Sequence, residues 1–406
     1  MEHDVAIIGA GPAGALASAM LSQKGYKVKV FEKQHFPRFS IGESLLPQSM
    51  HFIEKAGMLA AVQKANFQYK EGAAFCRGDE YNDFIFSEKF SSGWGTTFQV
   101  KRAEFDTILA EQAQLAGANI EYGVAITDVD FNVFPYRLQV ELEDGAVRQE
   151  HAKFVLDASG FGRVLPRLLD IETPSDFPSR VSLFTHIEDN AALDDFDRNK
   201  ILICVHPLHH DIWYWLIPFS DGRSSIGVVL PTDRYVVDND PTVVLKHWIE
   251  QEPRLSSILK SAVFDTPARS IQGYACNVKS LHGEGYALLG NAGEFLDPVF
   301  SSGVTIAMKS ADLAVDVLDR QLQGDQVDWQ ADYSDPLKQG VDTFRTFVEA
   351  WYDGRFQDIT FAKKQSPQVK SMVSSILAGY AWDTKNPYVK ESQRRINTLA
   401  EICRAQ

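Results

Sequence analysis

The chain has 406 residues, which is too many for one small core and enough for two domains or one large composite domain. A hydrophobic content of 45% and a charged content of 23% are ordinary for a globular enzyme, and no apolar run approaches the roughly 20 residues that cross a bilayer. The formal net charge of −14 argues against nucleic acid or an anionic membrane as a partner.

Cysteine usage and the N-terminus bear on the compartment. The cysteines stand far apart in the sequence, without a C-x-x-C pair, at Cys76, Cys204, Cys276 and Cys403. This spacing predicts neither a disulfide framework nor a zinc site, and we expect no metal. The chain starts Met1-Glu2-His3-Asp4, which is acidic where a secretory signal is basic, so we expect a reducing, cytoplasmic location.

A G-x-G-x-x-G motif follows the first predicted strand. The apolar strand from Asp4 to Ile8 leads into Gly9-Ala10-Gly11-Pro12-Ala13-Gly14. A helical pattern then runs from Ala15 through Lys24, and a second strand from Lys27 to Phe31 ends in Glu32. The motif therefore has the strand, helix and acidic residue that a dinucleotide site needs.

Each glycine of this motif has a separate role. Gly9 permits the tight turn, Gly11 lets the backbone approach a pyrophosphate, and Gly14 lets the helix pack closely on the strand. Glu32, which Lys33 follows, is placed to accept hydrogen bonds from ribose hydroxyls. The motif alone does not choose between FAD and NAD.

Later segments make that choice, and they share the pattern of an apolar strand or loop that enters a glycine-containing turn. They are Phe154 to Leu156 before Asp157-Ala158-Ser159-Gly160, Ala287 to Leu289 before Gly290-Asn291-Ala292, and Phe295 to Gly303 before a helix from about Val304. Together with the first motif they resemble FAD enzymes of the glutathione-reductase and aromatic-hydroxylase fold. The resemblance implies FAD and an α/β fold: a Rossmann-type FAD-binding domain, a mixed or antiparallel β-sheet substrate domain, and a C-terminal helical region.

The segment from Trp213 to Pro218 fits the pattern W-x-W-x-I-P. Both faces of such a strand are apolar, so the pattern alone is typical of a buried core strand. Trp213 and Trp215 are two residues apart and therefore point to the same face, where they form a broad indole wall. Because tryptophan is seldom fully buried, such a pair also fits a wall that shields a site.

Four motifs occur in a characteristic order: Pro37 to Ser44, Lys70 to Ala73, the tryptophan motif, and F-x-x-P-x-x-S-x-G from Phe295 to Gly303. In this order they resemble the flavin-dependent halogenases, and among these the stand-alone bacterial halogenases of phenols and of carrier-bound pyrroles or acyl groups. The resemblance runs from Asp4 to about Leu313. The family usually has Asp where this chain has Asn291, and the second catalytic acid of the tryptophan-specific members has no obvious equivalent.

The resemblance implies that reduced FAD, O₂ and halide give hypohalous acid, which moves through an internal tunnel to Lys70. A lysine partly desolvated in a tunnel has a lowered pKa and can act as a hydrogen-bond donor or as a nucleophile. The tryptophan wall would keep the organic substrate away from the flavin, which makes Lys70, Trp213 and Trp215 the predicted catalytic residues. Halide would bind at a helix N-terminus, at Ser301, Ser302 and Gly303.

The implied substrate is an electron-rich aromatic group: a phenol, a pyrrole or a carrier-bound aryl group. No second G-x-G-x-x-G motif occurs, which favours a separate flavin reductase as the source of reduced FAD. The stretch from Lys363 to Arg395 is basic, which fits either a solvated helix face or a docking site for an acidic carrier protein.

Two arginines complete the predicted cofactor site. Arg38 lies in the second motif, and Arg102 precedes a predicted helix from Glu104 to Ala116. A planar guanidinium pairs well with phosphate, although either arginine could instead form an ion pair. The predicted cofactor-binding residues are Gly9, Gly11, Pro12, Ala13, Gly14, Glu32, Lys33, Arg38, Ser44, Arg102, Asp157, Gly160, Gly290, Asn291, Asp297, Ser301, Gly303 and Val304.

The same patterns divide the chain into interleaved segments. We expect FAD-binding segments at 1–83, 101–181 and 271–328, and substrate-domain segments rich in β-branched and aromatic residues at 84–100 and 182–270. Residues 329–406 are expected to be helical.

Two alternatives to halogenation remain on the sequence. A monooxygenase (hydroxylase), or a reductase or dehydrogenase of acyl or polyprenyl chains, would use the same fold. A flavin-binding protein that assembles with a biosynthetic complex is the other. The tryptophan motif and Lys70 favour the halogenase over the first, and the intact flavin motifs favour an enzyme over the second.

Overall fold

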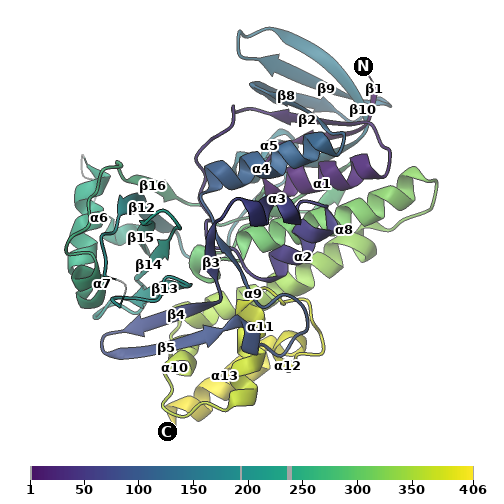
Figure 1. Cartoon of the computed structure of the whole chain (residues 1–406). Helices are drawn as coiled ribbons and strands as arrows, with labels where there is room; N and C mark the ends of the chain where they lie inside the picture. Colours follow the sequence, from purple (N-terminus) through teal and green to yellow (C-terminus); the bar gives the residue numbers. More distant parts are fainter. Residues whose placement is uncertain (1, 193, 236–239, 406) are drawn as a thin grey trace.

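The computed structural model describes residues 2–192, 194–235 and 240–405. It contains two large sheets, with a group of C-terminal helices at the bottom of Figure 1, beside β4 (Gly72–Arg77) and β5 (Glu80–Ile85) of the second sheet. The predicted α/β class, with a mixed second sheet and a helical C-terminal region, is confirmed.

The first sheet has a parallel centre. Its strands in spatial order are β19 (Tyr286–Leu288), β10 (Val147–Asp157), β1 (Glu2–Ile8), β2 (Val28–Glu32) and β7 (Asn119–Tyr122), with β18 (His282–Gly283) antiparallel at the edge of β19. The glycine motif lies at the carboxyl end of β1, as the sequence predicts, and α1 begins inside it at Pro12.

The two faces of this sheet belong to different cores because alternate residues of a strand point to opposite sides. Val5 and Ile7 of β1 pack with helices, and Ala6 and Ile8 pack with an antiparallel ribbon. The helices of the first core are α1 (Pro12–Gln23), α4 (Arg102–Leu115) and α8 (Gly303–Leu322), with the shorter α2 (Gln48–Lys55) and α3 (Leu59–Lys64) beside them. The second core holds β8 (Val124–Asp130), β9 (Tyr136–Leu142) and α5 (Val164–Leu168).

The second sheet carries the tryptophan motif on an inner strand. Its order is β16 (Arg269–Gln272), β12 (Arg180–Glu188), β15 (Arg223–Pro231), β14 (Trp213–Pro218), β13 (Lys200–Val205), β4 (Gly72–Arg77) and β5 (Glu80–Ile85). All neighbours are antiparallel except β13 and β4. The boundary predicted before residue 84 is therefore wrong for this sheet, because β4 and β5 already belong to it.

The two faces of the second sheet differ in what covers them. One face is covered by α6 (Pro241–Glu250) and α7 (Pro253–Ile258). The other face, with both tryptophans, is continuous with the core of the first sheet. Two small ribbons connect the units: β3 (Gln68–Lys70) with β6 (Thr97–Gln99), and β11 (Glu172–Pro174) with β17 (Cys276–Val278).

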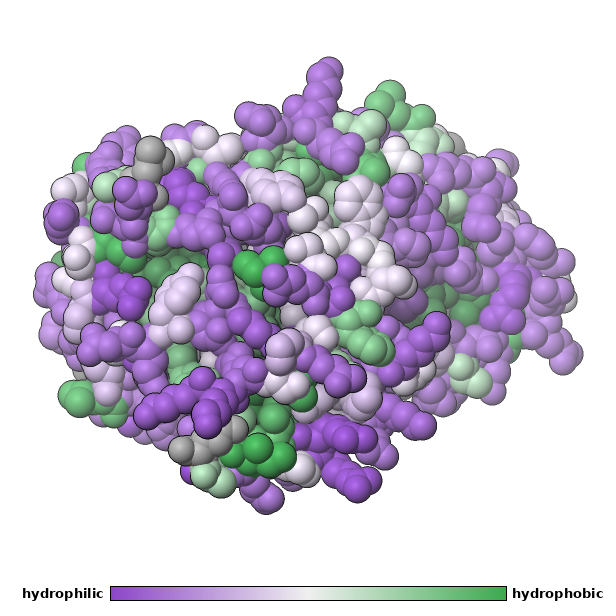
Figure 2. Space-filling view, turned by 60° about the horizontal axis from the view of Figure 1, so that its bottom comes forward, coloured by the Kyte–Doolittle hydropathy of each residue, from purple (hydrophilic) through white to green (hydrophobic). Residues whose placement is uncertain are grey.

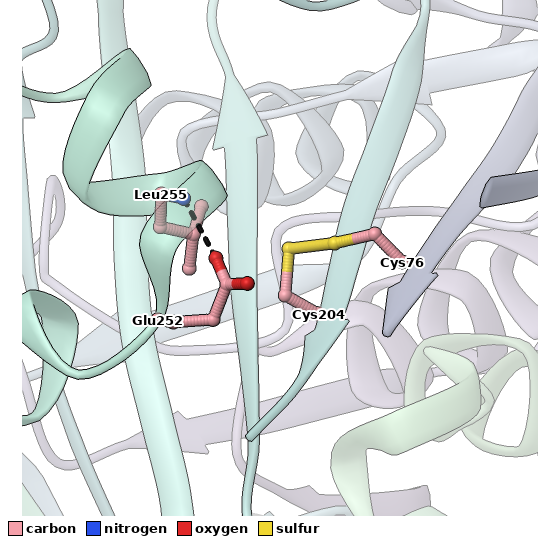
Figure 3. The surroundings of a disulfide bond; sticks show 4 residues. All are labelled: Cys76, Cys204, Glu252 and Leu255. Atoms are coloured by element: carbon pink, nitrogen blue, oxygen red, sulfur yellow. Dashed lines mark hydrogen bonds between the residues drawn. A yellow bond between two sulfur atoms is a disulfide. The ribbon is translucent and has the colours of Figure 1, made fainter. Parts of the chain in front are cut away.

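A disulfide joins Cys76 of β4 to Cys204 of β13, beside the buried carboxylate of Glu252 (Figure 3). The sequence prediction of no disulfide is therefore wrong for this pair. The residues are 128 positions apart, and only the parallel register of β4 and β13 makes them neighbours. Cys276 and Cys403 are free thiols.

The C-terminal helices are α9 (Asp335–Tyr352), α10 (Arg355–Thr360), α11 (Pro367–Leu377), α12 (Pro387–Lys390) and α13 (Ser392–Arg404). They contact both units, since α9 packs against α8 and α11 packs against β5. Phe344, Phe347 and Trp351 form the buried face of α9, as predicted. Nowhere in the described ranges does a helix combine the length and apolarity of a bilayer-spanning segment.

Candidate active site

A cavity of about 990 Å³ is lined by residues of both sheets. The predicted site residues in its lining are Gly9, Gly11, Pro12, Ala13, Glu32, Lys33, Arg38, Ser44, Arg102, Gly160, Trp213, Trp215, Asn291, Ser301, Gly303 and Val304. Other lining residues include Phe39, Glu43 and Ile217, which lie in the Pro37–Ser44 and tryptophan motifs. Phe161 also lines the cavity, but no motif of the sequence includes it.

The glycine loop leaves room for a ligand at one position only. A Cβ on Gly14 would lie 1.9 Å from the Gly9 carbonyl oxygen, and one on Gly9 would lie 2.7 Å from the Ala158 carbonyl oxygen, so both are packing positions. A Cβ on Gly11 would meet only the end of the Arg38 side chain, at 3.4 Å. Within the described residues no side chain caps the N-terminus of α1. The loop therefore fits a pyrophosphate that accepts free backbone N–H groups.

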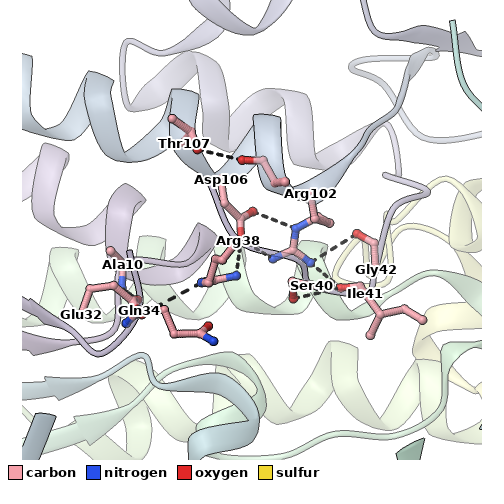
Figure 4. A network of polar contacts seen from close by, with 11 residues as sticks. Ala10, Glu32, Gln34, Arg38, Ser40, Ile41, Gly42, Arg102, Asp106 and Thr107 are labelled. Carbon is pink, nitrogen blue, oxygen red and sulfur yellow. Dashed lines mark hydrogen bonds and ion pairs between the residues drawn. The ribbon is translucent and has the colours of Figure 1, made fainter. Parts of the chain in front are cut away.

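Glu32 fixes the loop while it lines the cavity. One carboxylate oxygen accepts the Ala10 N–H at 2.8 Å, and the other accepts the Gln34 N–H at 2.9 Å (Figure 4). The carboxylate oxygens have further lone pairs toward the cavity, so a ribose hydroxyl can still donate to them.

Arg38 and Arg102 share one buried carboxylate, that of Asp106 (Figure 4). Arg102 binds Asp106 through two nitrogens at 2.7 and 2.9 Å, and Arg38 binds it at 3.1 Å. Arg102 also donates to the Ile41 carbonyl at 2.5 Å. The arginines thus hold the loop of residues 40–42 against α4, and the sequence analysis missed Asp106 because an i, i+4 Arg–Asp pair is common on any helix.

Several predicted cofactor residues lie behind the cavity wall and support it. Buried Asp157 accepts the N–H groups of Ser159 and Leu165 at 2.9 and 2.7 Å, which fixes the turn at Gly160. A Cβ on Gly290 would lie 2.8 Å from that of Ala307, so this glycine permits close packing of α8. The structure therefore favours a supporting role for Asp157 and Gly290 over direct contact with a cofactor.

Asp297 and Ser302 are also behind the wall, and both are buried. Asp297 accepts the Val299 N–H at 3.0 Å and the Tyr352 hydroxyl at 2.8 Å, and burial raises the pKa of Asp297 to about 6. Tyr352 in turn accepts the Trp213 indole N–H at 2.9 Å. The F-x-x-P segment, the C-terminal helices and the tryptophan strand are therefore tied together by one buried chain of hydrogen bonds.

Trp213 and Trp215 lie side by side on the cavity wall, with ring centroids 5.8 Å apart. Their common face is confirmed, and both side chains are buried. The Trp215 indole N–H donates to the Ser225 hydroxyl at 3.1 Å. Ile217 lines the cavity from the same face, so this part of the wall is apolar.

Lys70 is fully buried and does not line the cavity. Its Nζ donates to the Leu45 carbonyl at 2.8 Å and lies 5.3 Å from the centre of the Phe86 ring. Burial without an acidic partner lowers the pKa of Lys70 to about 7. Leu45 directly follows Ser44, which lines the cavity and whose buried hydroxyl finds no hydrogen-bond partner within the described residues. The Lys70 amine is therefore bonded to the residue next to cavity-lining Ser44, but it is not itself exposed to the cavity.

Comparisons with known proteins place these features in a family. An FAD binding domain family model matches residues 2–333. A chlorinase of 1H-pyrrole-2-carbonyl-peptidyl-carrier protein from Pseudomonas fluorescens is 30% identical over 98% of this chain and 94% of its own length.

Solved structures resemble the whole chain. A flavoprotein/dehydrogenase from Cytophaga hutchinsonii matches with a TM-score of 0.94 and 42% identity over 100% of this chain and 99% of that one. A flavin-dependent brominase matches with a TM-score of 0.85 and 27% identity over 100% of both chains. The C-terminal helices are therefore part of the shared fold.

Proposed function

Since this chain belongs to the FAD-binding domain family and is an FAD-dependent oxidoreductase of the flavin-dependent halogenase type, we propose that it halogenates an electron-rich aromatic group. The co-substrates in this proposal are O₂, halide and reduced FAD. When bound and reduced, FAD supplies the two electrons that activate O₂.

The observation that carries the proposal is the tryptophan wall on the cofactor cavity. Trp213, Trp215 and Ile217 face the cavity with apolar surface, and in this proposal they keep an aromatic substrate away from the flavin. A halide ion is much smaller than such a substrate. The proposed halide position is the backbone at Ser301 and Gly303, where α8 begins and its positive end favours an anion.

Cofactor binding in this proposal uses the residues that line the cavity. The pyrophosphate is assigned to the open side of Gly11 and the N-terminus of α1, and the ribose to Glu32. Asn291 lines the cavity next to the start of α8, where it can reach the ribityl chain. Arg38 and Arg102 would act mainly by holding the loop of residues 40–42 in place.

Lys70 is the proposed residue that receives the electrophile. With a pKa of about 7 a large share of its amine is neutral at neutral pH, so nitrogen can act as a nucleophile toward hypohalous acid or donate a hydrogen bond to it. Its contact with the Leu45 carbonyl places it one residue beyond the cavity-lining Ser44. Local opening of the wall at Ser44 and Leu45 would connect the two.

Two observations support a substrate bound to a carrier protein: the substrate of a relative, and a basic surface on this chain. The chlorinase relative acts on a pyrrole bound to a carrier protein. An acidic carrier protein would dock on a basic surface. Exposed basic side chains occur on the C-terminal helices and in the loops that connect them, at Lys363, Lys364, Lys385, Lys390, Arg394 and Arg395. They support a carrier-bound aryl substrate through charge complementarity. A separate flavin reductase and a cytoplasmic location remain predictions.

A second candidate is a flavin-dependent dehydrogenase or monooxygenase. The 42% identity to a flavoprotein/dehydrogenase favours it, as does the sealed position of Lys70. Mass spectrometry of turnovers separates the candidates: the protein, FAD, a flavin reductase and a panel of free and carrier-bound phenols and pyrroles are incubated with bromide, with chloride, or without halide. Halogenated products support the halogenase, whereas oxygenated or desaturated products that form equally well without halide support the second candidate.

A further inference from the structure

A carboxylate and an imidazole form a buried pair at the cavity wall. Oε1 of Glu43 lies 2.5 Å from Nε2 of His186, and the side chains are 2% and 18% exposed. Glu43 lines the cavity, and His186 on β12 stands behind it and is partly open to solvent. A single hydrogen bond therefore joins the partly exposed imidazole to a carboxylate that lines the cavity.

The pair lies next to the tryptophan wall. In the register of the second sheet His186 and Ile217 both lie opposite Ser225, on either side of it. In the next row Phe184 and Trp215 both lie opposite Gly227. Residues directly opposite each other share a face, so His186 lies on the same face as the wall, one row away. The Phe184 and Trp215 rings are in contact, with centroids 6.1 Å apart.

Aromatic rings hold the imidazole in place. The centroids of Phe39 and Phe219 lie 5.7 and 5.1 Å from that of His186. These rings fix the orientation of the imidazole toward Glu43. The arrangement favours proton movement along one route.

The proposed reaction needs a proton. Oxidation of halide balances as FADH₂ + O₂ + X⁻ + H⁺ → FAD + HOX + H₂O, in which FADH₂ loses two electrons to O₂ and X⁻ gives two more to oxygen. One proton from outside is consumed in each turnover. A carboxylate that lines the cavity and is hydrogen-bonded to an imidazole can deliver this proton as a general acid.

We propose that His186 and Glu43 form a proton relay for halide oxidation. The proton passes from solvent to His186, from His186 Nε2 to Glu43 Oε1, and from Glu43 to the oxygen that leaves as water. This inference rests on the proposed function, because it assigns the proton that halogenation consumes.

The test compares Glu43→Gln and His186→Gln with the parent protein and with His3→Gln. His3 makes an analogous bond to Glu150 at 3.2 Å, and that pair is 12% and 7% exposed but lies outside the cavity lining, so it serves as the matched control. The first readout needs no FAD: a far-downfield proton resonance from the Glu43–His186 bond should occur in the parent and the control, and vanish in both relay variants. FAD affinity should be unchanged in all of them.

The second readout is the rate of hypohalous acid formation, measured with a diffusible trap and no organic substrate. We expect both relay variants to lose about 10²-fold in rate, the range of general acid catalysis, and exogenous imidazole to restore part of the rate of a His186→Gly variant. Unchanged rates in the relay variants, or a loss that follows weakened FAD binding and is not rescued, would show that the pair is only a structural clamp. A parent that forms no hypohalous acid would instead remove the proposed function, and the relay with it.

Discussion

The indole of Trp215 lies over the backbone of Gly227 on the adjacent strand. A Cβ on Gly227 would come within 2.3 Å of the indole ring, so only glycine at this position lets the ring lie where it does. The position of the wall is thus set by β15 as well as by the tryptophan motif. This relationship gives a way to move the wall without removing it.

We expect Gly227→Ala to displace Trp215 and open the wall. The variant should shift O₂ consumption from halogenated product to hydrogen peroxide or hydroxylated product, as should folded Trp213→Ala and Trp215→Ala variants. Peroxide release and product mass measure the shift. Ser225→Ala is the control, since it removes only the hydrogen bond to Trp215, worth about 1 kcal/mol, and should keep the parental product ratio.

If the wall is core packing alone, the tryptophan truncations should cost about 3–5 kcal/mol of unfolding free energy and leave the products unchanged. Denaturant unfolding of the same variants measures that cost.

Lys70→Ala should reoxidise reduced FAD at a near-parental rate and give little halogenated product. The reason is that Lys70 is sealed from the cofactor cavity and acts, in our proposal, after hypohalous acid has formed. Oxygen uptake and product yield are measured in one reaction. Parental product yield in the variant would make Lys70 a structural residue.

Lys70 should also make the free energy of unfolding depend on pH. Its folded pKa of about 7 is below the ordinary value of 10.5, so between these values the unfolded chain binds more protons and stability rises with pH. Lys70→Met should lack this rise and should be more stable than the parent at pH 7, by up to a few kcal/mol. Urea unfolding from pH 7 upward tests this, and an unchanged pH slope in the variant would contradict the assignment.

Two glycines of the first motif should respond differently to substitution. Gly11→Val should fold and lose FAD binding, because its side chain enters the space of the pyrophosphate. Gly14→Val should fail in folding instead, because its Cβ would overlap the Gly9 carbonyl. Circular dichroism and flavin absorbance after reconstitution distinguish the two, and a flavin-loaded Gly11→Val protein would refute the cofactor placement.

The disulfide is open to direct measurement. Alkylation of the unfolded, unreduced protein should modify Cys276 and Cys403 only, and reduction should lower the unfolding free energy by about 4–5 kcal/mol, the range for a loop of this length. Alkylation of Cys76 and Cys204 without reductant would show that the pair is reduced in the purified protein.

The sequence predicted the parts of the site that depend on local geometry. The turn at Gly9 to Gly14, the acid at Glu32 and the common face of Trp213 and Trp215 all follow from short-range spacing, and the structure has them. Asp157 was predicted to bind the cofactor, but its buried carboxylate fixes the turn instead. The motif identifies the turn without showing which of its side chains point toward the cavity.

Contacts between distant segments were not predictable in this way. Glu43 meets His186 across 143 positions, and Cys76 meets Cys204 across 128. The cysteine pair depends on strand register in the second sheet, which the interleaved order of its strands hides. The other pair depends on how the loop that holds Glu43 packs against β12. The burial of Lys70 likewise depends on how β3 and the segment before α2 pack together.

The central claim is that oxidation in this cavity goes to halide. The most direct measurement is the fate of O₂ in the parent enzyme with reduced FAD and aromatic substrate, with bromide present or omitted. We expect halogenated product with bromide, and without it hydrogen peroxide with unmodified substrate. Efficient oxygenation or dehydrogenation of the substrate in the absence of halide would contradict the account.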